Sequence, residues 1–212
     1  MVSSSIKLNT LIAGIAVVLA TELAGWQLSQ WSGLPPLAVV GLVRIIQVAA
    51  IIWIIRFWDM GMIAIGWVPG SWLNGLKKGA VWSLAFAVAA GLGMAAVYMT
   101  GGHPLRMFGS PLPASGWELA LFFLVGGVIA PIAEEIFFRG LLYTFFRRWG
   151  IVCALIASTA IFVVLHAHRG IPYTQIVGGL VFAAAYETTG NLTVPITIHC
   201  LGNIAIFSLS LL

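Results

Sequence analysis

The stretch from Trp117 to Phe146 reads WELALFFLVGGVIAPIAEEIFFRGLLYTFF. Nearly all of its residues are apolar, yet Glu134, Glu135 and Arg139 lie close together in its second half. A helix of about 20 mostly apolar residues is long enough to cross a bilayer. This run is longer than one upright crossing needs, so we expect a kink at Pro131 or a tilted helix that projects beyond the bilayer.

The composition of the whole chain agrees with a membrane solvent. Of 212 residues, 61% are apolar and only 8% are charged, against about a quarter charged in a soluble domain. Such a chain cannot cover a water-facing surface, which excludes a soluble globular domain, a disordered protein and a coiled coil. The net charge is +4, but the basic residues lie mostly at the ends of apolar runs, so we expect the lipid bilayer as partner and no nucleic acid.

Glycines, prolines and charged residues divide the chain into seven candidate spans. The candidates are residues 10–30, 34–57, 77–99, 117–146, 150–168, 171–188 and 191–212. This pattern predicts an all-α fold: a polytopic transmembrane helical bundle of about seven spans that forms a single membrane domain over residues 1–212. Residues 59–76 are expected to form an interfacial loop or short amphipathic segment. Gly91 and Gly93 are expected to allow close helix packing.

The basic residues also predict the orientation of the chain. With the N-terminus in the cytoplasm, six of the basic residues near span ends fall inside and two fall outside. The inside group is Lys7, Arg56, Lys77, Lys78, Arg147 and Arg148, and the outside group is Arg106 and Arg169. An excess of Lys and Arg marks the cytoplasmic side. We therefore expect a multi-pass integral membrane protein with a cytoplasmic N-terminus.

Charged residues inside the spans carry the most information, because a charge at the bilayer centre costs about 2.5–3.5 kcal/mol on insertion scales. Glu22 and Arg44 lie at similar heights on the first two spans, which run in opposite directions. We expect them to pair across the interface between these spans. This pair is interpreted as structural.

The second charged group is the glutamate pair of the fourth span. Glu135 and Arg139 are four residues apart, so they share a helix face and can form an ion pair. Glu134 points about 100° away and has no partner within its own helix. A carboxylate without a partner in an apolar setting is poised to act as a general base. The alternative is a purely structural cluster of two glutamates and one arginine.

The third group combines histidines with helical spacing. Phe162 and His166 lie on one face of the fifth span, and His199 and Asn203 lie on one face of the last span. Their estimated depths are compatible with that of Glu134. We therefore expect Glu134, His166, His199 and Asn203 to converge from three helices on one buried polar pocket.

Three motifs in this order resemble those of the CAAX prenyl protease and bacteriocin-processing family of intramembrane endopeptidases. They read EEIFFR at residues 134–139, FVVLH at 162–166 and HCLGN at 199–203. The resemblance covers roughly residues 117–210. Residues 1–116 contain apolar spans without a motif, and residues 117–212 contain the spans of the expected catalytic core.

The resemblance implies a helical membrane bundle with a four-helix catalytic core that cleaves peptide bonds. It implies that Glu134 and His166 activate a water molecule, and that His199 and Asn203 stabilise the oxyanion. Glu135 and Arg139 become a supporting pair, and Phe162 supports His166. The implied partner is a protein or peptide substrate in or at the membrane.

Several alternatives stay open at this point. We favour a mechanism without a cofactor, but Glu134, His166 and His199 could instead bind zinc. A noncatalytic membrane partner, such as a bacteriocin-immunity protein, and a proton-coupled transporter are rival functions. Within the family, the short chain resembles a minimal prokaryotic member of the cell (inner) membrane, which suggests peptide maturation or removal of a C-terminal sorting signal.

Overall fold

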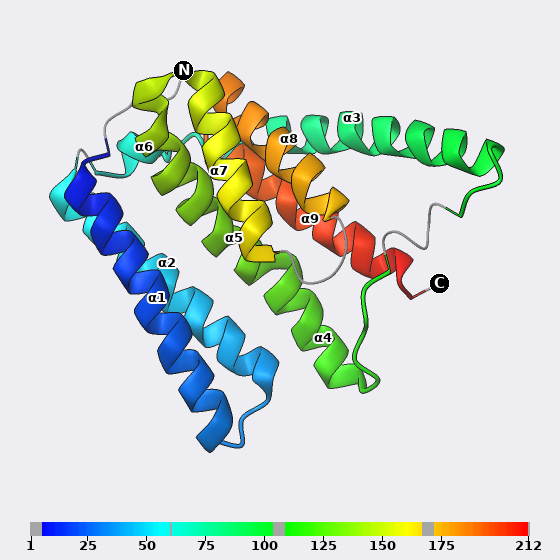
Figure 1. Cartoon of the computed structure of the whole chain (residues 1–212), viewed down its shortest axis with the longest axis horizontal. Helices are drawn as coiled ribbons and strands as arrows, with labels where there is room; N and C mark the ends of the chain where they lie inside the picture. The colour runs from blue at the N-terminus through cyan, green and yellow to red at the C-terminus, as the bar shows by residue number, and fades with distance from the viewer. Residues whose placement is uncertain (1–5, 60, 104–108, 167–171, 212) are drawn as a thin grey trace.

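The apolar segments form helices, and Figure 1 shows how these helices gather into a bundle. The structure is a computed structural model that describes residues 6–59, 61–103, 109–166 and 172–211. The separate helices are α1 Leu8–Trp31, α2 Pro36–Trp58, a 3₁₀ turn η1 Gly61–Ile65, α3 Trp72–Met99, α7 Ile151–His166, α8 Tyr173–Thr189 and α9 Thr193–Leu209. The residues described contain no strand, so the all-α prediction is confirmed.

Between α3 and α7 lies one long helix, Gly116–Trp149. Its consecutive parts are α4 Gly116–Leu124, η3 Val125–Ile129, α5 Ala130–Glu135, η4 Ile136–Tyr143, α6 Thr144–Phe146 and η5 Arg147–Trp149. Both η3 and η4 are π-helical, that is, wider than an α-helix. Pro131 has no N–H and crowds the carbonyl four residues earlier, so the wide turn just before it accommodates the proline within a continuous helix.

Among the described residues, four helices are long and apolar enough to cross a bilayer: α1, α2, α3 and the long helix Gly116–Trp149. The remaining three, α7, α8 and α9, are 16–17 residues long, which is close to the lower limit for a span. A membrane helical bundle fits this set of helices. Large apolar side chains are exposed on its outer face, for example Leu19 on α1 and Leu92 on α3, as a lipid solvent requires.

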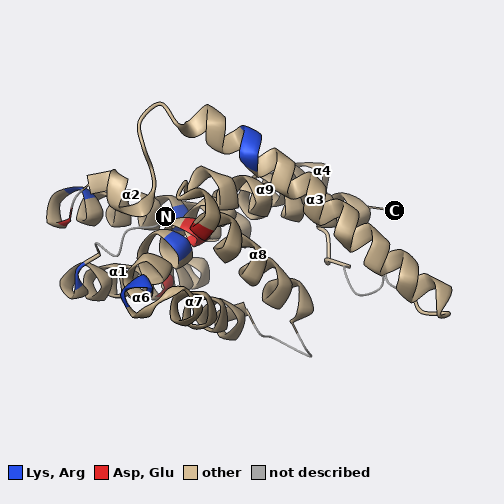
Figure 2. Cartoon of the chain, turned by 90° about the horizontal axis from the view of Figure 1, so that it is seen from above, with Lys and Arg blue, Asp and Glu red and all other residues tan. Residues whose placement is uncertain are grey.

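One end of the bundle collects several helix ends and basic residues. Lys7, before α1, donates to the backbone oxygen of Trp58 at the end of α2 and to the Asp59 carboxylate. Arg148 donates to the backbone oxygen of Ile6. Figure 2 marks Lys and Arg in blue, among others on α6 and on the first turns of α3. Lys7 and Arg148, two of the basic residues assigned to one side of the membrane, lie together where α1 begins and where α2 and the long helix end.

A close backbone approach ties η1 to the turn between α8 and α9. Gly66 has a φ of +70°, and a side chain there would collide with the backbone oxygen of Gly190. Leu192 N–H donates to Gly66 O at 3.2 Å. Only glycine suits this combination of a left-handed backbone and close contact. The contact fixes the start of α9, which carries His199.

Helix α3 packs over only part of its length. Gly75 lies against Asn191 and Thr193, and Gly79 lies against Thr197 of α9. Beyond these turns α3 projects from the bundle (Figure 1), and no described atom lies within 4 Å of a side chain built at Gly91 or Gly93. The expectation of close packing at these two glycines is therefore wrong.

Residues 59–76, expected to form an interfacial loop or a short amphipathic segment, contain more helix than a loop would. They contain η1, and α3 begins at Trp72, five residues before the expected start. The apolar residues ahead of Lys77 extend the helix, since a lysine is tolerated in a helical turn as readily as at its end.

Candidate active site

Glu134 meets two histidines from two other helices. Its Oε2 atom lies 3.6 Å from Nε2 of His166 on α7 and 3.8 Å from Nε2 of His199 on α9. The Glu134 side chain is 16% exposed, whereas that of its neighbour Glu135 is fully buried. These separations exceed a direct hydrogen bond, and polar groups this far apart are commonly bridged by water.

The far nitrogen of each ring fixes its orientation. Nδ1–H of His166 donates to the backbone oxygen of Phe162 at 2.8 Å. Nδ1–H of His199 donates to Oε1 of Glu135 at 2.7 Å. A carbonyl or carboxylate oxygen can only accept, so Nδ1 carries the proton in both rings. Both Nε2 atoms therefore face Glu134, as acceptors in the neutral ring or donors in the doubly protonated ring.

Behind His199 lies a fully buried ion pair. Arg139 Nη1 donates to Oε1 of Glu135 at 2.9 Å, and both side chains are 0% exposed. Arg139 also donates from Nη2 to the backbone oxygen of Gly179 on α8 at 3.1 Å. The predicted pairing of Glu135 with Arg139 is confirmed. The same carboxylate oxygen accepts from Arg139 and from His199, so the pair holds the ring in place.

Aromatic rings enclose this polar centre. The Phe182 ring stacks on His199, with centroids 4.6 Å apart and an interplanar angle of 22°. The Phe162 ring lies 4.3 Å from the His166 ring, and the Arg139 guanidinium lies 5.1 Å from the Phe162 centroid. Phe162 thus contributes its carbonyl and its ring to the orientation of His166, in line with its expected supporting position.

Asn203 lies one turn beyond His199 on α9, but its amide contacts a different level of the long helix. Asn203 Nδ2 donates to the backbone oxygen of Gly126 at 2.8 Å. Gly126 belongs to the wide η3 segment, about 12 Å along the helix from Glu134 at 1.5 Å per residue. The structure therefore brings Glu134, His166 and His199 together and leaves Asn203 in contact with η3. Its role at the oxyanion stays a prediction.

The pairing predicted for the first two spans is confirmed. Arg44 Nη1 donates to the Glu22 carboxylate, and Gln47 Nε2 donates to the same carboxylate oxygen at 3.0 Å. Gln47 also accepts from Arg44 at 2.8 Å and donates to Thr21 Oγ1 at 3.0 Å. Sequence reasoning missed Gln47, although it lies on the Arg44 face of α2, three residues further on.

A third charged cluster was also missed. Arg147 donates from Nε and Nη2 to both oxygens of Glu187, at 3.0 and 2.9 Å. The Tyr143 hydroxyl donates to Oε2 of Glu187 at 2.9 Å. The cluster joins the end of the long helix to the end of α8.

The zinc hypothesis concerns Glu134, His166 and His199. Over the part of the chain that the structure describes, no group of three or more His, Cys, Asp or Glu side chains is placed to hold a metal ion. Glu134, His166 and His199 are of the types that zinc accepts. Zinc binding stays a hypothesis, and His168, interpreted as an interfacial residue, lies outside the described residues.

Comparison with known proteins gives one match. Residues 116–205 match a family model described as type II CAAX prenyl endopeptidase Rce1-like. A search of curated proteins and a search of solved structures gave no match. The matched residues contain all three motifs, which confirms the resemblance seen in the sequence. With the four long apolar helices, the match supports a protease that is integral to a membrane.

Proposed function

We propose that this chain is an intramembrane endopeptidase that uses a water molecule activated by Glu134 and His166. The substrate is a protein or peptide in or at the membrane. The observation that carries the proposal is the approach of Glu134 Oε2 to Nε2 of His166 and Nε2 of His199, at 3.6 and 3.8 Å. Three groups that can take or give a proton thereby face one point in a membrane helical bundle.

Peptide hydrolysis needs a base for water and a donor for the leaving amine. The Glu134 carboxylate takes a proton from the water molecule while the water oxygen attacks the carbonyl carbon of the scissile peptide bond. The same proton then passes to the amide nitrogen, directly or through His166, and the C–N bond breaks. The products are a carboxylic acid and an amine, and Glu134 returns to its ionised form.

The oxyanion requires hydrogen-bond donors aimed at the point where charge develops. His199 supplies such a donor at Nε2 when its ring is doubly protonated, because Nδ1–H is held by Glu135. Asn203 supplies a second donor if its amide leaves Gly126 when substrate binds. Glu135 and Arg139 position His199 and do not touch the substrate.

We also propose a biological setting for this enzyme. We infer a prokaryotic cell-membrane enzyme with a cytoplasmic N-terminus that matures peptides or removes C-terminal sorting signals. The orientation is supported by Lys7 and Arg148, which lie together where α1 begins and where α2 and the long helix end. The chemistry is proposed to need no cofactor, with zinc bound by Glu134, His166 and His199 as the mechanistic alternative.

The test is cleavage of quenched-fluorescent membrane peptides by the purified protein in detergent. Glu134→Gln and His166→Ala should each lower kcat by about 10²–10⁴-fold, as expected for loss of acid–base catalysis, while the thermal unfolding transition is kept. Glu118→Gln is the matched control, because this glutamate accepts from Ser115 at the start of α4, far along the helix from Glu134.

Unchanged cleavage in folded Glu134→Gln protein would reject Glu134 as the base that activates water. Absence of cleavage by the wild type would reject the peptidase proposal and favour a noncatalytic role. Treatment with a strong chelator separates the two mechanisms. Full activity after chelation supports the glutamate mechanism, whereas loss of activity that zinc restores supports the metal mechanism.

A further inference from the structure

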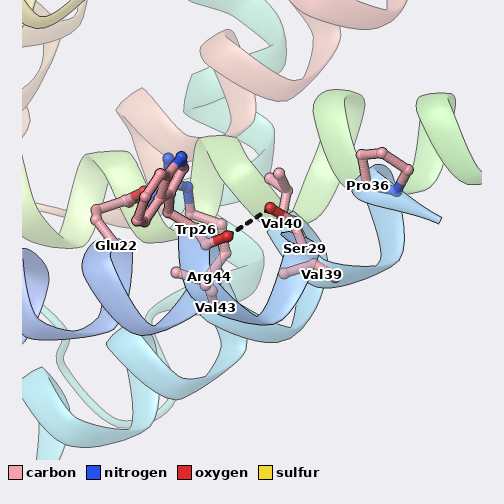
Figure 3. A pocket seen from close by; sticks show the side chains of 9 residues that line it. Glu22, Trp26, Ser29, Pro36, Val39, Val40, Val43 and Arg44 are labelled. Carbon is pink, nitrogen blue, oxygen red and sulfur yellow. Dashed lines mark hydrogen bonds and ion pairs between the residues drawn. The ribbon is translucent and has the colours of Figure 1, made fainter. Parts of the chain in front are cut away.

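A cavity of about 210 Å³ lies between α1 and α2, and we call it the α1–α2 cavity. Figure 3 shows Glu22 at one end and Pro36 at the other. Its walls combine apolar side chains with a few polar ones. The lining residues are Glu22, Gly25, Trp26, Ser29, Pro36, Val39, Val40, Val43 and Arg44.

The polar end of the α1–α2 cavity is unusually open for a structural ion pair. The side chain of Glu22 is 49% exposed and that of Arg44 is 23% exposed. Polar groups within a membrane are costly and are usually retained for a function. The pair therefore offers an acceptor and a donor that the helix interface does not fully use.

Helix α2, which forms one wall of the α1–α2 cavity, also packs on the long helix. A side chain built at Gly41 would come within 3.0 Å of Val125 in η3. Helix α2 contacts α5 as well, the segment that carries Glu134. A peptide with its scissile bond at Glu134 therefore has residues within reach of Arg44.

We propose that the α1–α2 cavity is a substrate subsite that holds an extended apolar segment beside the scissile bond. Glu22 accepts a backbone N–H of the substrate, Arg44 donates to a backbone carbonyl, and the valine wall receives an apolar side chain. In a membrane an unwound segment has no water to satisfy its backbone groups, so the protein must supply both partners. The inference rests on the proposed peptidase function.

The first experiment exchanges the two charges. Glu22→Arg combined with Arg44→Glu restores an ion pair but reverses the positions of donor and acceptor. The double variant should regain the unfolding temperature lost in the single Ala variants, while kcat/KM stays at least about 10-fold below wild type. Recovery of both stability and cleavage would show a purely structural pair and overturn the backbone contacts.

The second experiment fills the cavity with a larger side chain. It does not require a protein with exchanged charges to fold. Val40 and Leu42 lie on α2 and are 40% and 45% exposed, and only Val40 lines the cavity. Val40→Trp should lower kcat/KM by about 10-fold or more for peptides with a large apolar residue beside the scissile bond, and less for Ala at that position. Leu42→Trp, the matched control, should keep the wild-type preference.

The probes are quenched-fluorescent peptides that wild type cleaves and Glu134→Gln does not. If no such peptide is found, the peptidase proposal fails first. If Glu134→Gln abolishes cleavage but Val40→Trp keeps the wild-type rate and preference, the subsite alone is overturned. A lipid chain in the cavity would give this second result.

Discussion

Two ion pairs within the apolar bundle differ in their surroundings. Glu135 and Arg139 lie four residues apart on one helix, are fully buried, and share their contacts with His199 and Gly179. Glu22 and Arg44 join two helices and stay partly open beside a cavity. The closed pair has its main charges compensated by protein, whereas the open pair keeps groups available for another molecule. In the proposed mechanism, the closed pair positions His199 and the open pair binds the substrate backbone.

The largest expected effect is that of opening the closed pair. Arg139→Leu leaves Glu135 buried without its cation, so the free energy of unfolding should fall by about 3–5 kcal/mol. Arg56→Leu, an exposed arginine at the end of α2, should change it by less than about 0.5 kcal/mol. Denaturant unfolding in detergent measures both. Equal effects would contradict a special cost for leaving Glu135 buried without its cation.

A smaller effect is expected at the open pair. A double-mutant cycle with Glu22→Gln and Arg44→Gln should give a coupling energy of about 0.6–1.7 kcal/mol, the range of polar contacts between membrane helices. The same unfolding assay measures it. A coupling as large as the loss at Arg139 would mean that the Glu22–Arg44 pair is as closed as the Glu135–Arg139 pair.

The smallest effect is expected at the end of the bundle, for Arg147 and Glu187. This pair should couple by about 0.2–1 kcal/mol, because it lies near the helix ends. The coupling should shrink as salt is raised from about 0.1 to 1 M, which shortens the Debye length from about 10 to 3 Å. The stability loss in Arg139→Leu should stay the same over that range, and an equal salt effect there contradicts its burial.

The sequence predicted the helices well, because Gly, Pro and charged residues interrupt the apolar runs. It also predicted that Glu134, His166 and His199 meet, since depth along a span follows from residue number at 1.5 Å per residue. The match at residues 116–205 agrees with the motifs. These inferences depend on distance along a helix, which the sequence contains.

Other features depend on the rotation of one helix against another, which the sequence does not contain. The contact of Asn203 with Gly126 and that of Arg147 with Glu187 follow from the packing angles of α8 and α9 on the long helix. The stacking of Phe182 on His199 is of the same kind. Gly91 and Gly93 show the reverse case, because small residues permit close packing but do not cause it.

The two wide turns of the long helix, η3 and η4, limit which changes of length this helix can tolerate. This limit is as strict as the limit on which residues it can contain. Each residue of a regular helix turns the chain by about 100°. An insertion or deletion that these wide turns do not absorb would rotate Glu134 and Glu135 by about 100° relative to Gly126 and the face that receives Asn203. Related chains should therefore tolerate exchange of apolar residues over residues 125–143 far better than any insertion or deletion there.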